Sequence, residues 1–224
     1  MKIKAMVAVR AGSVRVPAKN TRPFSGTTLL ESKLVQLKRL RVLDSVIVNS
    51  DDPLALSIAA ELDCETVTRD PYYATSTVSM SDVYAHMATQ CDADVIVYAN
   101  CTSPLIRDAT IERLIAEFVR RDNRFDSLNT GSLIKEFLFR DNRPINYNLA
   151  AQPRSQDLPD IIALNFAINV LTRETMIKCR NVVGRTPRLR IIDDVESVDI
   201  DTPLDFWIAE RLYEERGGHG FLMS

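Results

Sequence analysis

The feature that most constrains this fold is a regular alternation of short apolar runs with segments of helical periodicity over the first half of the chain. The runs that indicate strands span residues 5–9, 45–49, 65–68 and 94–98. The segments that indicate helices span residues 29–40, 54–62, 79–90 and 111–121. Strands that alternate with helices pair in parallel and are covered by helices on both faces. The pattern therefore predicts a doubly wound, mostly parallel α/β sheet of the Rossmann-like type.

The rhythm changes at about residues 126–169, where short β-like pieces and three prolines replace helical periodicity. We interpret this region as a small β-rich insertion, outside the core, within one domain that covers residues 1–224. Exposed strand edges need to be covered, and a second copy of the chain commonly covers them. We therefore expect a homodimer formed through the insertion. A strand at 197–200 and a helix at 203–215 are expected to follow.

Composition excludes several classes of function. Lysine plus arginine (28) nearly balances aspartate plus glutamate (30), so no broad basic surface indicates a nucleic-acid partner. The apolar run at the amino terminus has about half the length of a membrane span and no cleavage site follows it, so no membrane association is expected. Four scattered cysteines and two histidines indicate neither a disulfide framework nor a zinc cluster, which favours a cytoplasmic protein.

The loop after the first expected strand reads RAGSVRVPAKN, from Arg10 to Asn20. Gly12 allows close approach of an anion to the backbone, and Ser13 can donate a hydrogen bond to it. The cations of the loop are Arg10, Arg15 and Lys19. This composition suits a polyphosphate, although basic surface loops also occur without a ligand and neither common phosphate-loop motif is present.

A second group of charged residues lies in the sequence SVDIDTPLD, at 197–205. Asp199 and Asp201 are two residues apart on an expected strand end, so both carboxylates should point to one face, as suits a hydrated magnesium ion. Such acid pairs are also often only solvated. Asp205 should belong to the first turn of the next helix, so it is not counted as a ligand.

Six motifs occur in a fixed order along the chain. The residues that form them are Arg10, Gly12, Ser13, Pro17, Lys19 and Asn20, then Arg69, Ala74, Thr77 and Ser79, then Thr102 to Leu105 with Arg107, then Pro153, Arg154, Gln156, Leu158 and Pro159, then Asn165, and finally Val198 to Asp205. Together they resemble the motifs of the acylneuraminate cytidylyltransferases, the family of CMP-sialic acid synthetases and related CMP-nonulosonic acid synthetases. The resemblance covers nearly the whole chain.

The resemblance implies a nucleotidyltransferase fold and the transfer of CMP from CTP to the anomeric hydroxyl of an acidic sugar, with release of pyrophosphate. The implied catalytic residues are Arg10, Lys19, Asp199 and Asp201, of which the two aspartates would hold Mg²⁺, with Mn²⁺ as a substitute. The implied nucleotide-binding residues are Arg10, Ala11, Gly12, Ser13, Lys19, Asn20, Arg69, Ala74 and Ser79. The implied sugar-binding residues are Asn100, Thr102, Ser103, Lys135, Arg154, Gln156, Asn165 and Phe166. These roles require the first loop and the aspartate pair to meet in the folded chain.

The chain also departs from the family pattern. Asn100 stands where the family has glutamine, Cys101 where it has proline, and Phe166 where it has glycine. Val14 and Ser76 replace a lysine and an aspartate. These changes leave the nucleotide half largely intact and the acceptor open, so a different acidic acceptor, such as an amino-sugar acid or a phosphonate, is an alternative. A nucleotide-binding subunit without turnover is another. An NAD-binding domain is disfavoured, because the first loop has one glycine where three are needed.

Overall fold

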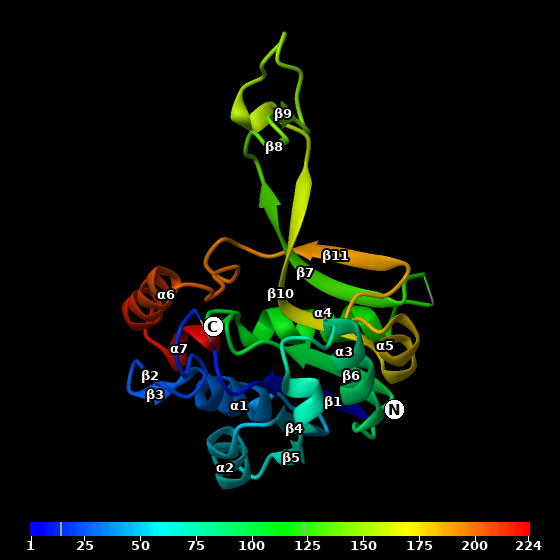
Figure 1. The fold of residues 1–224 in the computed structure, drawn as a ribbon, viewed down its shortest axis with the longest axis vertical. Coiled ribbons are helices and arrows are strands. Elements are labelled where there is room, and N and C mark those ends of the chain that lie inside the picture. The colour runs from blue at the N-terminus through cyan, green and yellow to red at the C-terminus, as the bar shows by residue number, and fades with distance from the viewer. Residues whose placement is uncertain (14, 123) are drawn as a thin grey trace.

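The structure, a computed structural model, describes residues 1–13, 15–122 and 124–224. Within these residues a seven-stranded sheet has the order β11-β7-β10-β6-β1-β4-β5 (Figure 1). Its strands are β1 (Ile3–Val9), β4 (Ser45–Ser50), β5 (Glu65–Thr68), β6 (Val95–Ala99), β7 (Ser127–Ile134), β10 (Ile161–Thr172) and β11 (Pro187–Ile191). Strand β10 is antiparallel to both neighbours, and every other pair in the sheet is parallel. The prediction of a mostly parallel sheet is confirmed.

Helices cover both faces of this sheet. They are α1 (Leu29–Arg39), α2 (Pro53–Glu61), α3 (Met80–Thr89), α4 (Asp108–Val119), α5 (Arg173–Cys179), α6 (Pro203–Glu215) and α7 (His219–Leu222). Side chains alternate along β1, so Ala5 and Val7 pack with α1, α2, α4, α6 and α7, whereas Met6 packs with α3 and α5. Two cores, one on each face, follow from this alternation, and the doubly wound architecture is the one predicted.

Local sequence explains where several helices begin. The Thr28 side chain accepts from the backbone N–H of Glu31 at the start of α1, and Asp52 caps α2 immediately before Pro53. At α6, Thr202 and Asp205 form a reciprocal capping box. The prediction that Asp205 belongs to the first helical turn is confirmed.

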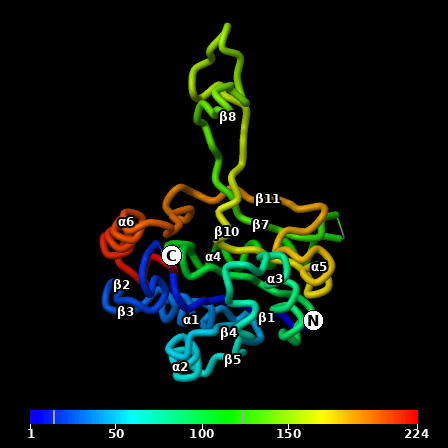
Figure 2. Tube along the Cα trace, in the orientation of Figure 1, coloured from blue at the N-terminus to red at the C-terminus, as the bar shows by residue number. Residues whose placement is uncertain are grey.

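The region predicted to be an insertion outside the core begins and ends inside the main sheet, so that prediction is wrong at both ends. Asn129 of β7 and Asn169 of β10 are fully buried, and their side chains are hydrogen-bonded to each other at 2.8 Å. These polar residues hid two core strands from a hydropathy pattern. The part between them, residues 132–163, forms an arm that projects from the sheet (Figures 1 and 2).

The arm carries four short elements. They are the antiparallel pair β8 (Phe139–Arg140) and β9 (Arg143–Pro144), the 3₁₀ turn Ser155–Asp157, and the outer ends of β7 and β10. Another short pair, β2 (Pro23–Phe24) and β3 (Thr27–Thr28), precedes α1, and a 3₁₀ turn, Pro71–Ala74, precedes α3.

The carboxyl-terminal third differs from expectation in two ways. Residues 197–200 form no strand and lie in an irregular segment with turns, where the Ser197 N–H donates to the Asp193 carbonyl. Helix α5 and strand β11 were not predicted. Strand β11 is recognisable only in three dimensions, because it joins the sheet by parallel pairing with the distant β7. Among the described residues no helix has the length and apolar character that crossing a membrane requires.

Candidate active site

The loop after β1 lies at the carboxyl edge of the sheet, where parallel α/β sheets bind their ligands. Gly12 has φ +75°, a left-handed conformation that glycine adopts at little cost. The Ala11 N–H donates to Asp51 Oδ1 at 3.0 Å, which ties this loop to the one after β4. Arg10, Ser13, Arg15, Val16 and Lys19 line a polar cavity of about 230 Å³. Three cations around one cavity suit a polyanion.

The aspartate pair meets this loop directly. Arg15 Nη2 lies 2.7 Å from Asp201 Oδ1, and Lys19 Nζ lies 3.8 Å from the same oxygen. Lys19 Nζ also donates to the Ile200 carbonyl at 2.6 Å. The structure therefore brings together the two segments that the proposed chemistry requires. Their alignment does not come from the strand alternation that we expected, because Asp199 and Asp201 lie in an irregular segment.

Asp199 is the more enclosed member of the pair. Its Oδ1 is buried and has no hydrogen-bond partner among the described residues. Burial raises the pKa of Asp199, and the nearby Asp201 carboxylate raises it further, against a hydrogen bond from Thr102 and the charge of Lys19. A buried carboxylate oxygen without a donor is a favourable place for a cation.

The donor set around the aspartates fits magnesium. The described residues contain no cluster of three or more His, Cys, Asp or Glu side chains that could hold a metal by themselves. Mg²⁺ is commonly held by one or two carboxylates, with waters and substrate phosphates as its other ligands. Asp199 and Asp201 supply that number of carboxylates beside a cavity suited to phosphate.

A larger cavity of about 390 Å³ adjoins the phosphate cavity, and Arg10 lines both. Its lining residues are Ala8, Arg10, Arg69, Tyr73, Thr75, Ser76, Val78, Met80, Val83, Met87 and Tyr98. Arg69 is buried, and its guanidinium donates to the Asn49 side chain at 2.7 Å and to the Asn49 carbonyl at 2.9 Å. Tyr73 stacks on His86 with ring centroids 3.8 Å apart. An apolar wall with a few polar groups is typical of a small-molecule pocket.

The predicted nucleotide residues fall into two groups. Arg69 lines the 390 Å³ cavity, and Asn20 lines a small hollow beside the phosphate loop, with a buried Oδ1 that has no described partner. Ala74 and Ser79 do not line the cavity, although their neighbours do. The Ser79 hydroxyl instead caps α3 by accepting from the Asp82 N–H. Sequence reasoning left Tyr73 open between pocket wall and loop packing, and it is a pocket wall.

The predicted acceptor residues of the sheet gather where β6 ends and β10 is irregular. Asn100 Nδ2 donates to the Phe166 carbonyl at 3.1 Å, and Thr130 Oγ1 donates to Asn165 Oδ1 at 2.7 Å. Ser103 is fully buried. Phe166 has φ +56°, the left-handed region that a bulky residue rarely adopts. The glycine of the family motif is explained by this backbone conformation, and here a phenylalanine holds it at a cost of about 1 kcal/mol.

Three further predicted acceptor residues lie on the arm. Lys135 pairs with Asp160 at 2.5 Å and also donates to the Leu158 carbonyl. Arg154 pairs with Asp157, and Gln156 lies in the 3₁₀ turn of the arm. Because the arm projects away from the sheet (Figure 1), the structure groups these three residues with one another and not with the aspartates of the same chain.

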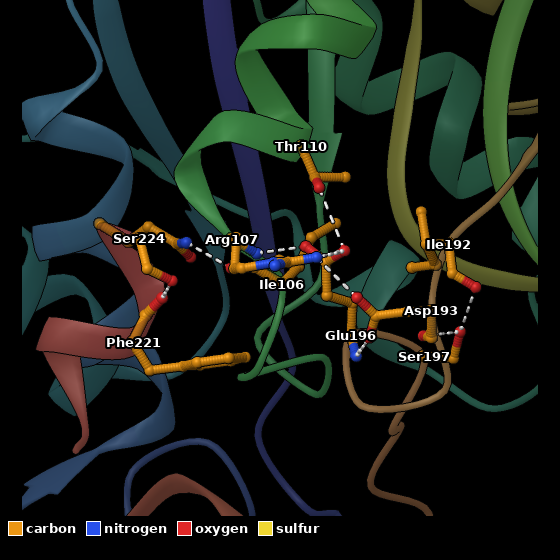
Figure 3. A network of polar contacts seen from close by, with 10 residues as sticks. Ile106, Arg107, Thr110, Ile192, Asp193, Glu196, Ser197, Phe221 and Ser224 are labelled. Atoms are coloured by element: carbon orange, nitrogen blue, oxygen red, sulfur yellow. Dashed lines mark hydrogen bonds and ion pairs between the residues drawn. The ribbon is translucent and has the colours of Figure 1, made fainter. Parts of the chain in front are cut away.

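A buried glutamate that the sequence did not reveal anchors the segment before the aspartates. Glu196 is 1% exposed and accepts from the Arg107 N–H at 2.7 Å, from the Arg107 guanidinium at 3.1 Å and from the Thr110 hydroxyl at 3.1 Å (Figure 3). Arg107 also pairs with Asp193 at 2.6 Å. The network fixes residues 193–196 to the start of α4, a few residues before Asp199.

Replacing Glu196 by alanine is expected to lower the free energy of unfolding by about 2 kcal/mol, because charge-assisted hydrogen bonds are lost and the Arg107 N–H and Thr110 hydroxyl lose their acceptor. Urea denaturation followed by circular dichroism measures it. Glu215, an exposed residue at the end of α6, provides the control, and Glu215→Ala should change stability little. Equal stabilities for the two variants would refute an anchoring role.

A doubly wound sheet with a cationic loop after its first strand and an aspartate pair beside that loop defines a nucleotide-binding enzyme site. A family model described as Cytidylyltransferase matches residues 5–152, and the chain belongs to this family. It is therefore a CTP-dependent nucleotidyltransferase, as the motifs indicated.

Individual relatives agree with this assignment. The chain is 22% identical to the post-translational flagellin modification protein B of Campylobacter coli, over 96% of each chain. It is 25% identical to the CMP-N,N'-diacetyllegionaminic acid synthase of Legionella pneumophila, over 96% of this chain and 97% of the relative. A solved CMP:2-keto-3-deoxy-manno-octonic acid synthetase in complex with CTP shares the fold, with a TM-score of 0.69 at 13% identity, over 96% of this chain and all of that one. The predicted family resemblance is confirmed.

Proposed function

We propose that this enzyme transfers CMP from CTP to the anomeric hydroxyl of an acidic sugar of the nonulosonic-acid type and releases pyrophosphate. The observation that carries the proposal is the contact of Arg15 and Lys19 with the segment of Asp199 and Asp201, which places a polyphosphate loop beside a metal-binding pair. The legionaminic acid synthase among its relatives supports the acceptor class.

The two adjoining cavities divide the nucleotide between them. Arg10, Ser13 and Lys19 would bind the triphosphate in the 230 Å³ cavity, and the cytidine would occupy the 390 Å³ cavity against Arg69 and Tyr73. Arg10 lines both cavities, so it would contact the nucleotide where the phosphates join the nucleoside. Fixed cations at the phosphates stabilise the charge that develops as pyrophosphate leaves.

Asp199 and Asp201 would hold Mg²⁺ on the phosphates. A bound magnesium ion neutralises phosphate charge and favours ionisation of the attacking hydroxyl. Lys19, at 15% side-chain exposure, keeps its ammonium fixed between the Ile200 carbonyl and Asp201. Arg15 is more exposed and lines the phosphate cavity, so it can exchange its contact with Asp201 for a phosphate oxygen. No covalent enzyme intermediate is needed, because in-line attack requires only positioning and charge stabilisation.

The acceptor sugar would bind beside Asn100, Thr102 and Asn165, next to the strained Phe166. The phenyl ring at that position supports the alternative of an acidic acceptor other than sialic acid, such as an amino-sugar acid or a phosphonate, because it fills space where the family has none. Conservation of the charged contacts at the phosphate loop argues against a subunit without turnover. The four free cysteines fit a cytoplasmic enzyme.

We further propose that the enzyme is a homodimer whose arms take part in the interface. The arm exposes the large apolar side chains of Phe139, Ile145 and Leu149, each more than half exposed in the single chain. A second copy would cover them. Lys135 and Arg154 could reach an acceptor carboxylate only at the site of that second copy, since the arm points away from its own.

Ile145→Asp is expected to convert the dimer to a monomer, because a buried unpaired carboxylate at an apolar interface is strongly unfavourable. Size-exclusion chromatography with light scattering should give twice the chain mass of 25.2 kDa for the wild type and a single chain mass for the variant. Gln152→Asp, an exposed polar position on the same arm, should leave the dimer intact. A monomeric wild type would contradict the proposal.

The reaction is tested by mixing purified enzyme, CTP and Mg²⁺ with sialic, legionaminic, pseudaminic or 3-deoxyoctulosonic acid and measuring pyrophosphate. We expect release with at least one of these acids and none without an acceptor. Thermal shift with other acidic acceptors in the presence of CTP separates the alternative, because a ligand that binds the folded state raises its melting temperature. Absence of pyrophosphate with all four acids would exclude the nonulosonic acceptor class.

A further inference from the structure

Lys33 is a buried lysine on the core-facing side of α1. Its side chain is 2% exposed, and Nζ donates to Gln36 Oε1 at 2.8 Å and to the Ser103 carbonyl at 3.1 Å. Both acceptors are uncharged. An ammonium buried among neutral groups is costly, and burial accordingly lowers the pKa of Lys33 to about 8. A methionine of similar length would fill this space without that cost.

The Ser103 carbonyl belongs to the loop between β6 and α4 that also holds the aspartate pair. The neighbouring Thr102 carbonyl accepts from the Ile200 N–H at 2.9 Å, and the Thr102 side chain is hydrogen-bonded to Asp199. On its other side, the Ile200 carbonyl accepts from Lys19. The backbone beside the aspartates is therefore held by Lys19 directly and by Lys33 through the 101–104 loop.

The rest of this loop has separate anchors on the same helix. Gln36 donates to the Ile106 carbonyl at 2.6 Å and to Asp108 at 3.0 Å, and Arg39 pairs with Asp108 at 2.5 Å. Lys33, Gln36 and Arg39 thus form a buried polar strip along α1 that follows the course of residues 103–108. Within this strip, Lys33 is the member that contacts the end of the loop nearest the aspartates.

We propose that Lys33 is a positioning residue for cytidylyl transfer, whose ammonium fixes the 101–104 loop and, through Thr102, the orientation of Asp199 and the backbone of Ile200. The proposal rests on the function proposed above. Lys33 touches neither cavity, so it acts only through the loop. Loss of the charge should loosen the loop without removing a contact to the nucleotide.

The first test uses the ligand-free enzyme, without metal or nucleotide. Lys33→Met should accelerate hydrogen exchange of the Ile200 amide by about 10-fold, a change within the range seen for local opening, while amides of β1 exchange as in the wild type. Lys38→Met is the matched control, because Lys38 lies on the same helix and contacts Leu62 and Asp63 instead. Unchanged exchange at Ile200 in Lys33→Met would overturn the proposal.

The second test uses turnover. Loss of a residue that orients a metal ligand typically costs about 10-fold or more in activity, so Lys33→Met should lower kcat by about 10-fold with little change in KM for CTP. The wild type should also lose kcat above about pH 8, as the ammonium loses its proton, and Lys33→Met should lack this limb. The charged and titratable groups that face Lys33 are Arg39, Cys101 and Asp108. Burial raises the pKa of Cys101 to about 12, so its titration lies apart from that limb.

The two proposals fail in different ways. A wild type that forms no pyrophosphate refutes the function, whereas the exchange experiment needs neither acceptor nor turnover and still decides the role of Lys33. If Lys33→Met does not fold, the wild type answers the question through Ile200 exchange measured from pH 7 to 9.5. That rate should rise more steeply than the tenfold per pH unit of base-catalysed exchange if the ammonium holds the loop. A slope equal to that of the β1 amides would overturn the proposal.

Discussion

Replacing Asp199 by asparagine is expected to lower kcat/KM by about 10³-fold, the loss typical of removing a group that stabilises transition-state charge. The side chain keeps its shape but loses the negative charge that would hold Mg²⁺ beside the triphosphate. Its buried Oδ1, which has no described partner, would have nothing to offer a cation as an amide oxygen of lower charge. Pyrophosphate release at several Mg²⁺ concentrations measures the effect, and excess metal should restore only part of the activity.

The same substitution should not destabilise the ligand-free fold. Burial raises the pKa of Asp199, so the folded state favours the neutral carboxyl, and ionisation of Asp199 costs stability as the pH rises through and above the unfolded pKa. At pH 7 a neutral asparagine avoids this cost, so thermal unfolding without metal should occur at the wild-type temperature or above. Asp194→Asn, at an exposed position of the same segment, is the control for activity. Full activity in Asp199→Asn would refute the assigned role.

Lys19→Met is expected to lower kcat by about 10²-fold, because a fixed ammonium that stabilises the departing pyrophosphate is removed. The effect should exceed that of Arg15→Met. Lys19 is mostly buried and held by the Ile200 carbonyl at 2.6 Å, whereas the Arg15 side chain is 65% exposed and its charge is screened by water. Steady-state kinetics with CTP as the varied substrate separates the change in kcat from that in KM.

Two controls keep this prediction specific. Lys178→Met, at an exposed position on α5 that pairs with Glu174, should leave turnover unchanged. Calorimetric titration of CTP in the presence of Mg²⁺ should show weaker binding to Lys19→Met than to the wild type. If Lys19→Met turns over like the wild type while Arg15→Met does not, the charge on the leaving group is stabilised by Arg15 and the assignment must be exchanged.

Much of the fold followed from local patterns. Apolar runs and helical periodicity located β1, β4, β5, β6 and the helices between them, because these segments bury one face and repeat at the period of their structure. The Thr28 and Asp52 caps and Pro53 marked helix starts for reasons confined to one turn. The motifs of the phosphate loop likewise indicated a nucleotide site, since their chemistry resides in residues close together in sequence.

Local patterns failed where distant contacts decide the structure. Polar Asn129 and Asn169 are core residues because each satisfies the other across β7 and β10. Lys33 was overlooked, although it interrupts the apolar face of a predicted helix, which is a signal that could have identified it. Glu196 carries no signal in its neighbours, because Arg107, its main partner, lies far away in the chain.

By itself the sequence determined the alternation of strands and helices, the position of the cationic loop at a strand end, and the family to which the chain belongs. Tertiary structure alone decided that residues 197–200 form no strand, that Phe166 adopts a left-handed backbone, and that Arg15 and Lys19 meet the segment of Asp201. The reason is physical: periodicity and capping act within one or two turns of chain. Charge pairing and burial depend instead on which distant segments the folded sheet brings into contact.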